Sequence, residues 1–353
     1  MKNIMRKCLL ALVGFGLVPA LFAGNPDRQG EAGFGQLLLV PYAQTAGVHA
    51  LNTAHVSGVD AFGSNIAGLG NIDRMELNLG QTIYLSGTDV NIFHLGFATK
   101  LKKGGAFGVS LVNVDVGDIR RTSVNNPEGD GTTFSPSLFS LNIGYAKTFE
   151  DKISVGLAVK VVSESIEDIK MSTVAFDAGV QYRTGGANDD RFRFGVALRN
   201  VGAPASFTGD GLITNTPISF EGGEFLESTV QRGSKVEVQS SIKIGASFGV
   251  VEGDINKLMV MANFTSNAYS RDVIGAGLEY GFKNLFAVRG GYIYEVDQIE
   301  GEESIYSGLA AGASVQLPLG KADNASILSL DYAYRTTRRF DGTHNIGLRL
   351  NLR

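Results

Sequence analysis

Alternation of apolar and polar residues dominates this chain from about residue 70 to its last residue. Stretches of about ten residues carry an apolar side chain at every second position, with glycine, polar or charged residues between them. In the closing stretch, residues 344–353, the apolar positions are Ile346, Leu348, Leu350 and Leu352. A period of two is that of a β-strand with one apolar face. About fourteen such stretches follow one another, so the sequence predicts an all-β fold of antiparallel strands.

The connections between the strands distinguish two environments for this pattern. A soluble barrel or sandwich turns the apolar face towards a shared core, whereas a transmembrane barrel turns it towards lipid. Long and short connections alternate here, except at SGTD (86–89); the longest are residues 118–137 and 202–235, and short ones are KKGG (102–105), FEDK (149–152) and GFKN (281–284). Outer-membrane barrels combine short periplasmic turns with longer external loops. The sequence therefore predicts a transmembrane antiparallel β-barrel of about 14 strands over residues 73–353.

The regular pattern of the chain end has a physical reason in such a barrel. An unpaired backbone amide in hydrocarbon costs several kcal/mol, so the sheet keeps no free edge. The strand at residues 74–84 is therefore expected to pair with the closing strand, and Leu352 is expected to face lipid. Both termini are expected on the periplasmic side of the outer membrane, where lipid and lipopolysaccharide surround the barrel.

The first 23 residues have the features of a secretory signal peptide. Lys2, Arg6 and Lys7 precede an apolar run over residues 8–22, and the small residue Ala23 marks a cleavage site. A transmembrane anchor is the less favoured alternative, because the run is interrupted by glycine and proline and is shorter than the roughly 20 residues that a spanning helix needs.

Composition excludes several classes of function. The single cysteine, Cys8, lies in the signal peptide, so the mature chain has no disulfide, thiol nucleophile or cysteine-bound metal. The signal peptide carries three of the 31 basic residues and none of the 35 acidic ones, which leaves 28 against 35 and a net charge of −7. An acidic exported protein has no electrostatic basis for binding nucleic acid.

Residues 24–72 differ from the rest of the chain and are rich in small residues. A lumen whose walls carry many glycines needs filling, because voids lose contact energy and a wide pore leaks. We therefore predict that this segment folds back into the barrel as a plug. A flexible periplasmic leader is the alternative, since glycine and serine favour a mobile chain.

Two motifs of this segment resemble the PorV/PorQ family of outer-membrane proteins. GQLLLVPYAQTAG (35–47) is similar to the family's LLIP-like stretch and small-residue helix. GVDAFGSNIAGLG (58–70) is similar to its N-P-A-G-L turn, which FadL-like barrels share, with Asn65, Ala67, Gly68 and Leu69 matching and Ile66 in place of proline. SGTDVNIFHLGFATKL (86–101) and FGVALRNVG (194–202) also resemble the family, and the resemblance covers most of the mature chain.

The resemblance implies a fourteen-stranded barrel in the outer membrane of a Bacteroidota-type bacterium. Family members serve the type IX secretion system, where they bind a large translocon barrel and secreted cargo proteins. The first functional hypothesis is thus a non-enzymatic accessory or substrate-handling component of that system. The alternative is a FadL-like transporter of hydrophobic small molecules, which an apolar lumen pocket beside a kinked strand would support.

Residue patterns give no sign of an enzyme, a cofactor or a metal site. His49 and His55 are six residues apart, which is not the spacing of a helical metal pair. His344 has Asp341 nearby in sequence but no serine in a nucleophile arrangement. The acidic stretch of residues 295–303 lacks the ordered spacing of a calcium loop and is expected to be a solvated or partner-facing charge run.

Two further groups of residues are candidates for function. The lumen-facing charges have both signs, so they are expected to form compensating pairs that hold the plug or to line a pathway: Asp177, Arg193, Arg199, Lys243, Glu279, Arg289, Asp331 and Arg349. The two longest external loops carry aromatic and proline residues that would form a docking surface or, alternatively, a lid: Pro127, Phe134, Pro136, Phe207, Pro217, Phe220 and Phe225.

Overall fold

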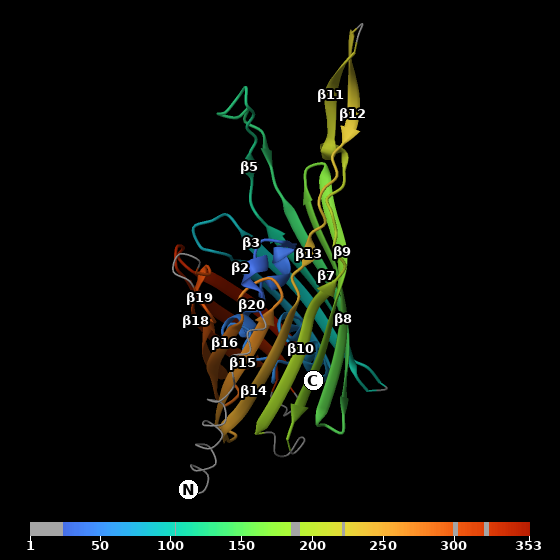
Figure 1. Cartoon of the computed structure of the whole chain (residues 1–353). Helices are drawn as coiled ribbons and strands as arrows, with labels where there is room; N and C mark the ends of the chain where they lie inside the picture. Colours follow the sequence, from blue (N-terminus) through green and yellow to red (C-terminus); the bar gives the residue numbers. More distant parts are fainter. Residues whose placement is uncertain (1–23, 103, 185–190, 221–222, 299–302, 321–324) are drawn as a thin grey trace.

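The computed structural model is a closed barrel of antiparallel strands around a folded N-terminal segment (Figure 1). It describes residues 24–102, 104–184, 191–220, 223–298, 303–320 and 325–353, so the predicted signal peptide, residues 1–23, lies outside the described residues. The fourteen barrel strands, in chain order, are β2 (Met75–Ile83), β3 (Asn91–Lys100), β4 (Ala106–Asp115), β7 (Ser137–Phe149), β8 (Ile153–Ile166), β9 (Ile169–Arg183), β10 (Phe192–Gly202), β14 (Ser241–Glu252), β15 (Asn256–Asn267), β16 (Val273–Phe282), β17 (Phe286–Glu295), β18 (Tyr306–Pro318), β19 (Ile327–Thr337) and β20 (Thr343–Leu352).

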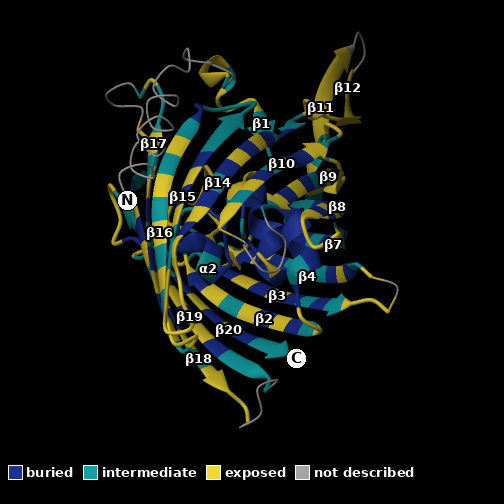
Figure 2. Cartoon of the chain, turned by 90° about the horizontal axis from the view of Figure 1, so that it is seen from below, coloured by how far each residue is buried: buried dark blue, intermediate teal, exposed yellow. Residues whose placement is uncertain are grey.

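The alternating pattern places the apolar side chains on the outside of the barrel. In β20, Ile346 and Leu348 are exposed, whereas Gly347 and Arg349 between them are buried, and Figure 2 shows this alternation along the strands. Because the polar positions point inwards, the outer face is that of a lipid-facing barrel. In the described part of the chain, no helix is long and apolar enough to cross a membrane.

Aromatic side chains mark both borders of the apolar exterior. One set lies towards one rim of the barrel (Phe93, Phe139, Tyr292, Tyr294 and Tyr332), and the other lies towards the opposite rim (Phe107, Tyr145, Phe149, Tyr182, Phe192, Phe248, Tyr280, Phe282 and Phe286). Aromatic girdles at both interfaces are a feature of transmembrane barrels, because the rings sit at the level of the lipid headgroups. The apolar band between them fits the hydrocarbon layer.

Closure between the first and last strands is confirmed. β2 pairs with β20 over the whole length of β2, from Met75 opposite Leu352 to Ile83 opposite His344. Every barrel strand is therefore paired on both sides, and the sheet has no free edge with unpaired backbone amides in the hydrocarbon layer.

The two rims differ in their connections. We call them the short-turn rim, where residues 150–152, 253–255 and 283–285 connect strands, and the long-loop rim, where residues 116–136 and 203–240 do so. The long-loop rim carries two ribbons, β5 (Ile119–Arg120) with β6 (Thr133–Phe134) and β11 (Ile213–Phe220) with β12 (Gly223–Val230). The second ribbon projects far beyond the barrel (Figure 1). Residues 163–172 form a tight hairpin at this rim, in which Ile166 of β8 pairs with Ile169 of β9.

Residues 34–72 lie inside the barrel as a plug (Figure 2). The N-terminal segment contains mainly short turns: η1 (Pro26–Arg28), β1 (Ala32–Gly33), η2 (Gly35–Leu38), α2 (Ala43–Ala46), η3 (Gly58–Gly63) and η4 (Ile66–Asn71). Its apolar core packs directly on the wall, where Leu69 and Val59 are fully buried with Ala146 of β7 and Ala98 of β3. The plug therefore shares one core with the barrel.

The two described ends of the chain lie at opposite rims. Gly24 lies against Asp272, in the loop between β15 and β16 at the long-loop rim. Arg353 follows β20 at the short-turn rim, with its Nε 3.0 Å from Oδ2 of Asp73. The expectation that both termini are periplasmic therefore does not hold for the described chain, because the plug segment crosses the lumen from one rim to the other.

The closure of the barrel predicts that the lipid-facing end of β20 is essential for assembly. Replacing both Leu350 and Leu352 with aspartate places two charges on the outer face of the strand that closes the sheet, near its short-turn end. Each charge costs less than the about 2–4 kcal/mol of a basic residue at the bilayer midplane, but the two lie together on the closing strand. We expect no heat-modifiable barrel in outer-membrane fractions on electrophoresis. Asn351→Asp, on the lumen side of the same strand, is the control; normal assembly of the double variant would contradict this role.

Candidate functional site

A belt of glycines on the inner wall lets the plug approach the barrel backbone. Nearly every barrel strand has a lumen-facing glycine at this level: Gly80, Gly96, Gly108, Gly144, Gly156, Gly179, Gly195, Gly245, Gly275, Gly291, Gly312 and Gly347. Several of them pair across adjacent strands, as Gly156 does with Gly179. A Cβ atom on Gly156 would lie 2.7 Å from the backbone carbon of Ile66, and one on Gly195 would lie 2.8 Å from Cα of Ala54. The belt is thus the surface onto which the plug fits.

The predicted plug turn lies in the centre of this contact. Asn65 caps η4 by accepting a hydrogen bond from the backbone N–H of Ala67 at 3.1 Å, and it donates to the carbonyl of Val180 in β9 at 3.0 Å. Leu69 is fully buried and faces Gly108, and a Cβ on Gly68 would collide with the carbonyl of Val56. All four predicted residues of the turn therefore fix the plug, and Ile66, in the position of the usual proline, packs against Gly144.

Polar contacts attach other parts of the plug to the wall. Asp60 of η3 accepts hydrogen bonds from Thr45 and from Asn78 of β2, the latter at 2.8 Å. Glu76 of β2 accepts one from the backbone N–H of Val59 at 2.8 Å. Burial raises the pKa of the Asp60 carboxyl, while the nearby Arg349 lowers it. These bonds satisfy polar groups that the lumen takes out of water.

Most of the predicted lumen charges form ion pairs. Asp177 lies 2.6 Å from Nζ of Lys160 and 3.7 Å from Nε of Arg199. Two further pairs join Arg289 to Glu279 at 2.9 Å and Arg349 to Asp331 at 3.3 Å. Arg199 also holds the plug, because its Nη1 donates to the carbonyl of Gly63 at 2.9 Å. The sequence-based expectation of compensating pairs was thus right for these residues.

Lys243 of β14 is the exception. Its side chain is buried, and no described residue forms a hydrogen bond or ion pair with its ammonium group. Lys160 and Arg199 stand nearby with the same charge, against the single carboxylate of Asp177. A buried cation without a partner is costly, so this position calls for a functional explanation.

Lys243 lines a cavity of about 190 Å³ between the plug and the wall, towards the long-loop rim, which we call the upper cavity. Its apolar lining includes Leu38, Val40, Ala50, Leu51, Val273 and Ile293, and its cations are Arg199, Lys243 and Arg335. No carboxylate is among the described residues that line it. Within the described chain, the buried atoms Nε2 of His49 and Oδ1 of Asn263 lack hydrogen-bond partners in this lining. The cavity therefore joins an apolar floor to a cationic wall with free polar groups.

Irregular backbone borders the same cavity. Between Tyr306 and Ala310 the pairing of β18 with β19 shifts register, and Gly308 there has a φ of 100°. A second shift lies in β10 between Leu198 and Val201. Bulges of this kind bend a strand and interrupt its ladder, and they are common beside functional sites. Tyr306 of β18 and Arg199 of β10 both line the cavity.

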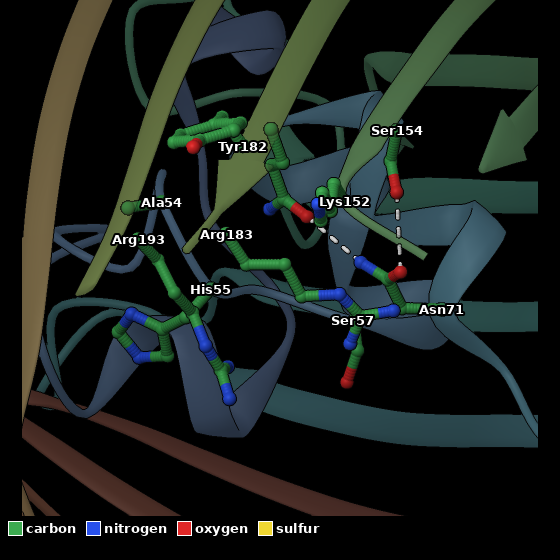
Figure 3. Close-up of a pocket in the computed structure, with 10 residues that line it drawn as sticks. Ala54, His55, Ser57, Asn71, Lys152, Ser154, Tyr182, Arg183 and Arg193 are labelled. Carbon is green, nitrogen blue, oxygen red and sulfur yellow. Dashed lines mark hydrogen bonds between the residues drawn. The ribbon is translucent and has the colours of Figure 1, made fainter. Parts of the chain in front are cut away.

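A second cavity, of about 210 Å³, lies at the short-turn end of the plug (Figure 3). It is lined mostly by polar and charged groups, including His55, Lys152 and Arg183. Asn71, at the end of η4, crosses it to hydrogen-bond Gln181 of β9 at 2.9 Å and Ser154 of β8 at 3.2 Å. These bonds attach the end of the plug to the wall, so we assign this cavity to plug anchoring.

The predicted docking residues do not form one surface. Phe207 is partly buried and packs against the core cluster that contains Phe34 and Met171. Phe225 of β12 is half exposed, and Pro217 lies opposite Leu226 in the β11–β12 ribbon, at the end of which lies Phe220. The remaining predicted residues are in the other loop, where Pro127 lies between β5 and β6, Phe134 lies in β6 and Pro136 follows it. The β11–β12 ribbon thus presents large apolar groups to solvent, and so do Ile119 and Val124 of the other loop.

The four histidines lie in separate places. Among the described residues, no three His, Cys, Asp or Glu side chains gather as metal ligands, and the acidic stretch of residues 295–303 is described only in part. His94 lies 3.1 Å from Asn78 in the lumen, and His344 lies on the exterior, 2.8 Å from the hydroxyl of Tyr332 rather than on Asp341. Burial lowers the pKa of His49 to about 3 and that of His55 to about 4.

The glycine belt predicts that one added methyl group displaces the plug. In Gly156→Ala the Cβ meets the backbone of Ile66 and Ala67, which cannot move aside as a flexible side chain would, at a cost of about 1–3 kcal/mol. We expect increased conductance in planar lipid bilayers. Gly281→Ala is the control, because its Cβ would have no neighbour closer than 3.7 Å. Wild-type conductance in Gly156→Ala would show that the plug does not depend on the belt.

The two plug histidines predict that acid loosens the plug. Both pKa values are lowered from 6.5, so the packed state binds fewer protons than a released state. The packing is fully favourable above about pH 6.5 and weakens as the pH falls towards 4, by about 2 kcal/mol per histidine at pH 5. We expect conductance to rise between pH 7 and 5, and to rise less in a His49→Gln, His55→Gln double variant. His344→Gln is the control and should leave the pH profile of conductance unchanged. The same unchanged profile in the double variant would show that His49 and His55 are not the source of the pH dependence.

Comparison with known proteins identifies the fold. No protein-family model and no curated protein sequence matches this chain. Among solved structures, a deletion mutant of the TodX monoaromatic hydrocarbon channel superposes with a TM-score of 0.53 at 13% identity, covering 88% of this chain and 97% of that one. A Pseudomonas aeruginosa FadL homologue gives 0.51 at 12%, covering 88% and 96%, and the Ralstonia pickettii toluene transporter TbuX gives 0.50 at 13%, covering 88% and 97%. The chain therefore has the fold of FadL-like outer-membrane barrels.

Proposed function

We propose that this protein is an outer-membrane transporter that takes up small molecules with an apolar portion. The long-loop rim faces the cell exterior in this proposal, because long loops are external in outer-membrane barrels. Similar folds belong to a monoaromatic hydrocarbon channel and a toluene transporter. Likeness of fold alone does not carry function, so the proposal depends on the site.

The observation that supports this proposal most directly is the composition of the upper cavity, which Lys243 lines. Its apolar floor fits a hydrocarbon group, and Lys243 with Arg199 and Arg335 offers charge to an anionic one. Because three cations and no described carboxylate line it, the cavity attracts an incoming anion. The ligand class that satisfies both parts is an amphipathic anion, such as a medium-chain carboxylate.

One segment of the plug is suited to a change of conformation. His49 and Ala50, on the cavity floor, both have left-handed backbone conformations, with φ of 50° and 56°. Such conformations are strained for residues with a side chain and cluster at functional sites. The rest of the plug is fixed by the glycine belt, so passage involves this segment and the neighbouring bulge of β18 rather than expulsion of the plug.

A role in type IX secretion is the second candidate, and the β11–β12 ribbon favours it. This ribbon projects from the long-loop rim, and Phe225, Leu226 and Val230 are 51%, 70% and 66% exposed. Exposed apolar groups of this size are suited to a protein partner. The support otherwise rests on the motif resemblance, while the paired lumen charges and fixed plug suit either role.

The transport proposal predicts charge-dependent binding at Lys243. We expect octanoate to bind the purified protein, and Lys243→Met to weaken its affinity about tenfold or more, because one charge-assisted contact is lost. Octanol, which shares the chain but not the charge, should respond little. The measurement is calorimetric titration in an uncharged detergent.

Lys257→Met is the matched control, because Lys257 is exposed and contacts Asn284 at the short-turn rim. Equal loss of octanoate binding in both lysine variants would contradict a site at Lys243. Absence of octanoate and octanol binding to the folded wild-type protein would overturn the transport proposal, and recovery of secretion components on β11–β12 in pull-downs would then favour the second candidate.

A further inference from the structure

The first ten described residues, 24–33, form a strap along the long-loop rim. At its far end, Ala32 and Gly33 of β1 pair in parallel with Glu237 and Val238 of β13 (Glu237–Val238). Phe34, directly after it, is fully buried in the cluster with Leu37. Most residues between Gly24 and this anchor are exposed. The strap is therefore fixed at one end by pairing and packing.

The near end of the strap lies on the loop of residues 268–272. A Cβ on Gly24 would lie 2.6 Å from Oδ1 of Asp272 and 2.9 Å from the carbonyl oxygen of Ser270. The guanidinium of Arg28 lies 4.4 Å above the ring of Tyr269 in the same loop. Asp272 is only 5% exposed. The chain thus enters the rim beside two oxygen acceptors, in a crevice that only glycine fits.

The strap spans the ends of the strands that line the upper cavity. β13 directly precedes β14, which begins with Ser241, and the loop of residues 268–272 directly follows β15, which ends with Asn267. Ser241 and Asn267 both line the cavity, as does Leu38 a few residues beyond the strap. The strap therefore joins two segments that lead directly into the rim of this cavity.

We infer that removal of the leader after Ala23 creates the ion pair that fastens this strap. Hydrolysis of the peptide bond between Ala23 and Gly24 adds one water, leaving a carboxylate on Ala23 and an α-ammonium group on Gly24. That ammonium is carried by the Cα of Gly24, which lies in the crevice formed by the Asp272 carboxylate and the Ser270 carbonyl. There it can pair with the carboxylate, whereas a secondary amide would offer one uncharged N–H. Resting on the proposed function, the pair makes maturation a control on entry to the cavity.

The test compares strap release in matched variants of the mature protein. Asp272→Asn removes the charge at constant shape, and insertion of Ala-Ser between Ala23 and Gly24 moves the ammonium away without changing the strap. Asp73→Asn, which removes an exposed pair with Arg353 at the opposite rim, is the control. Mass spectrometry first establishes that the wild-type chain begins at Gly24; any other first residue overturns the inference.

Release is read as the rate at which trypsin liberates residues 24–28 by cutting after Arg28. We expect a rate about tenfold higher in Asp272→Asn and in the insertion variant, because a charged hydrogen bond no longer holds the chain. The control should cleave like wild type. Equal rates in all variants would refute the ion pair, and this readout needs no ligand.

Octanoate association kinetics test the link to the cavity. Faster association in Asp272→Asn supports the strap as a barrier to entry, whereas wild-type kinetics together with fast strap cleavage refute that part. If octanoate fails to bind any variant while Asp272→Asn still releases the strap faster, the ion pair stands and the transport proposal fails.

Discussion

Contact between the backbone of the plug and the glycines of the barrel wall is the constraint on which this structure depends. A fourteen-stranded barrel is too wide for wall side chains to fill, and an N-terminal segment has to supply the missing volume. Glycine on most strands lets turns such as the one at Asn65 lie directly on the sheet. Because the fit is made between backbones, it leaves little room to shift the plug as a body. Function is thereby confined to the spaces beside it.

The membrane imposes the second requirement, which is to satisfy every polar group that the strands turn inwards. Pairs such as Lys160 with Asp177 do so within the wall, and Arg199 does so between wall and plug. These contacts explain why lumen charges of both signs coexist with a barrel that is closed and filled. Lys243 differs from these residues, because its neighbours Lys160 and Arg199 are paired with Asp177 and, within the described chain, it is not.

The sequence predicted the barrel well, because period two, loop length and edge closure are local consequences of a lipid exterior. It also predicted a plug, since glycine-rich walls imply a filler, whereas the turn at Asn65 came from the motif resemblance. It did not predict the direction of the N-terminal segment, which depends on long-range contacts such as Gly24 with Asp272. The prediction of a docking surface was wrong for Phe207, which lies in a long loop but packs against the cluster that contains Phe34. Lys243 was predicted to face the lumen, but the pairing of its neighbours with other groups depends on the three-dimensional arrangement.

The arrangement around Lys243 argues that the upper cavity is more than a packing defect. On β14 the next lumen-facing position is Gly245, so a small residue is accommodated at this level of the wall. A lysine at 243 instead places a third basic group beside Lys160 and Arg199, and an entering anion would stabilise its charged form. His49, with its left-handed backbone, and the bulge of β18 border the same cavity as Lys243. Charge, strain and irregular pairing thus coincide where the plug is least fixed, as expected of a site that exchanges ligands.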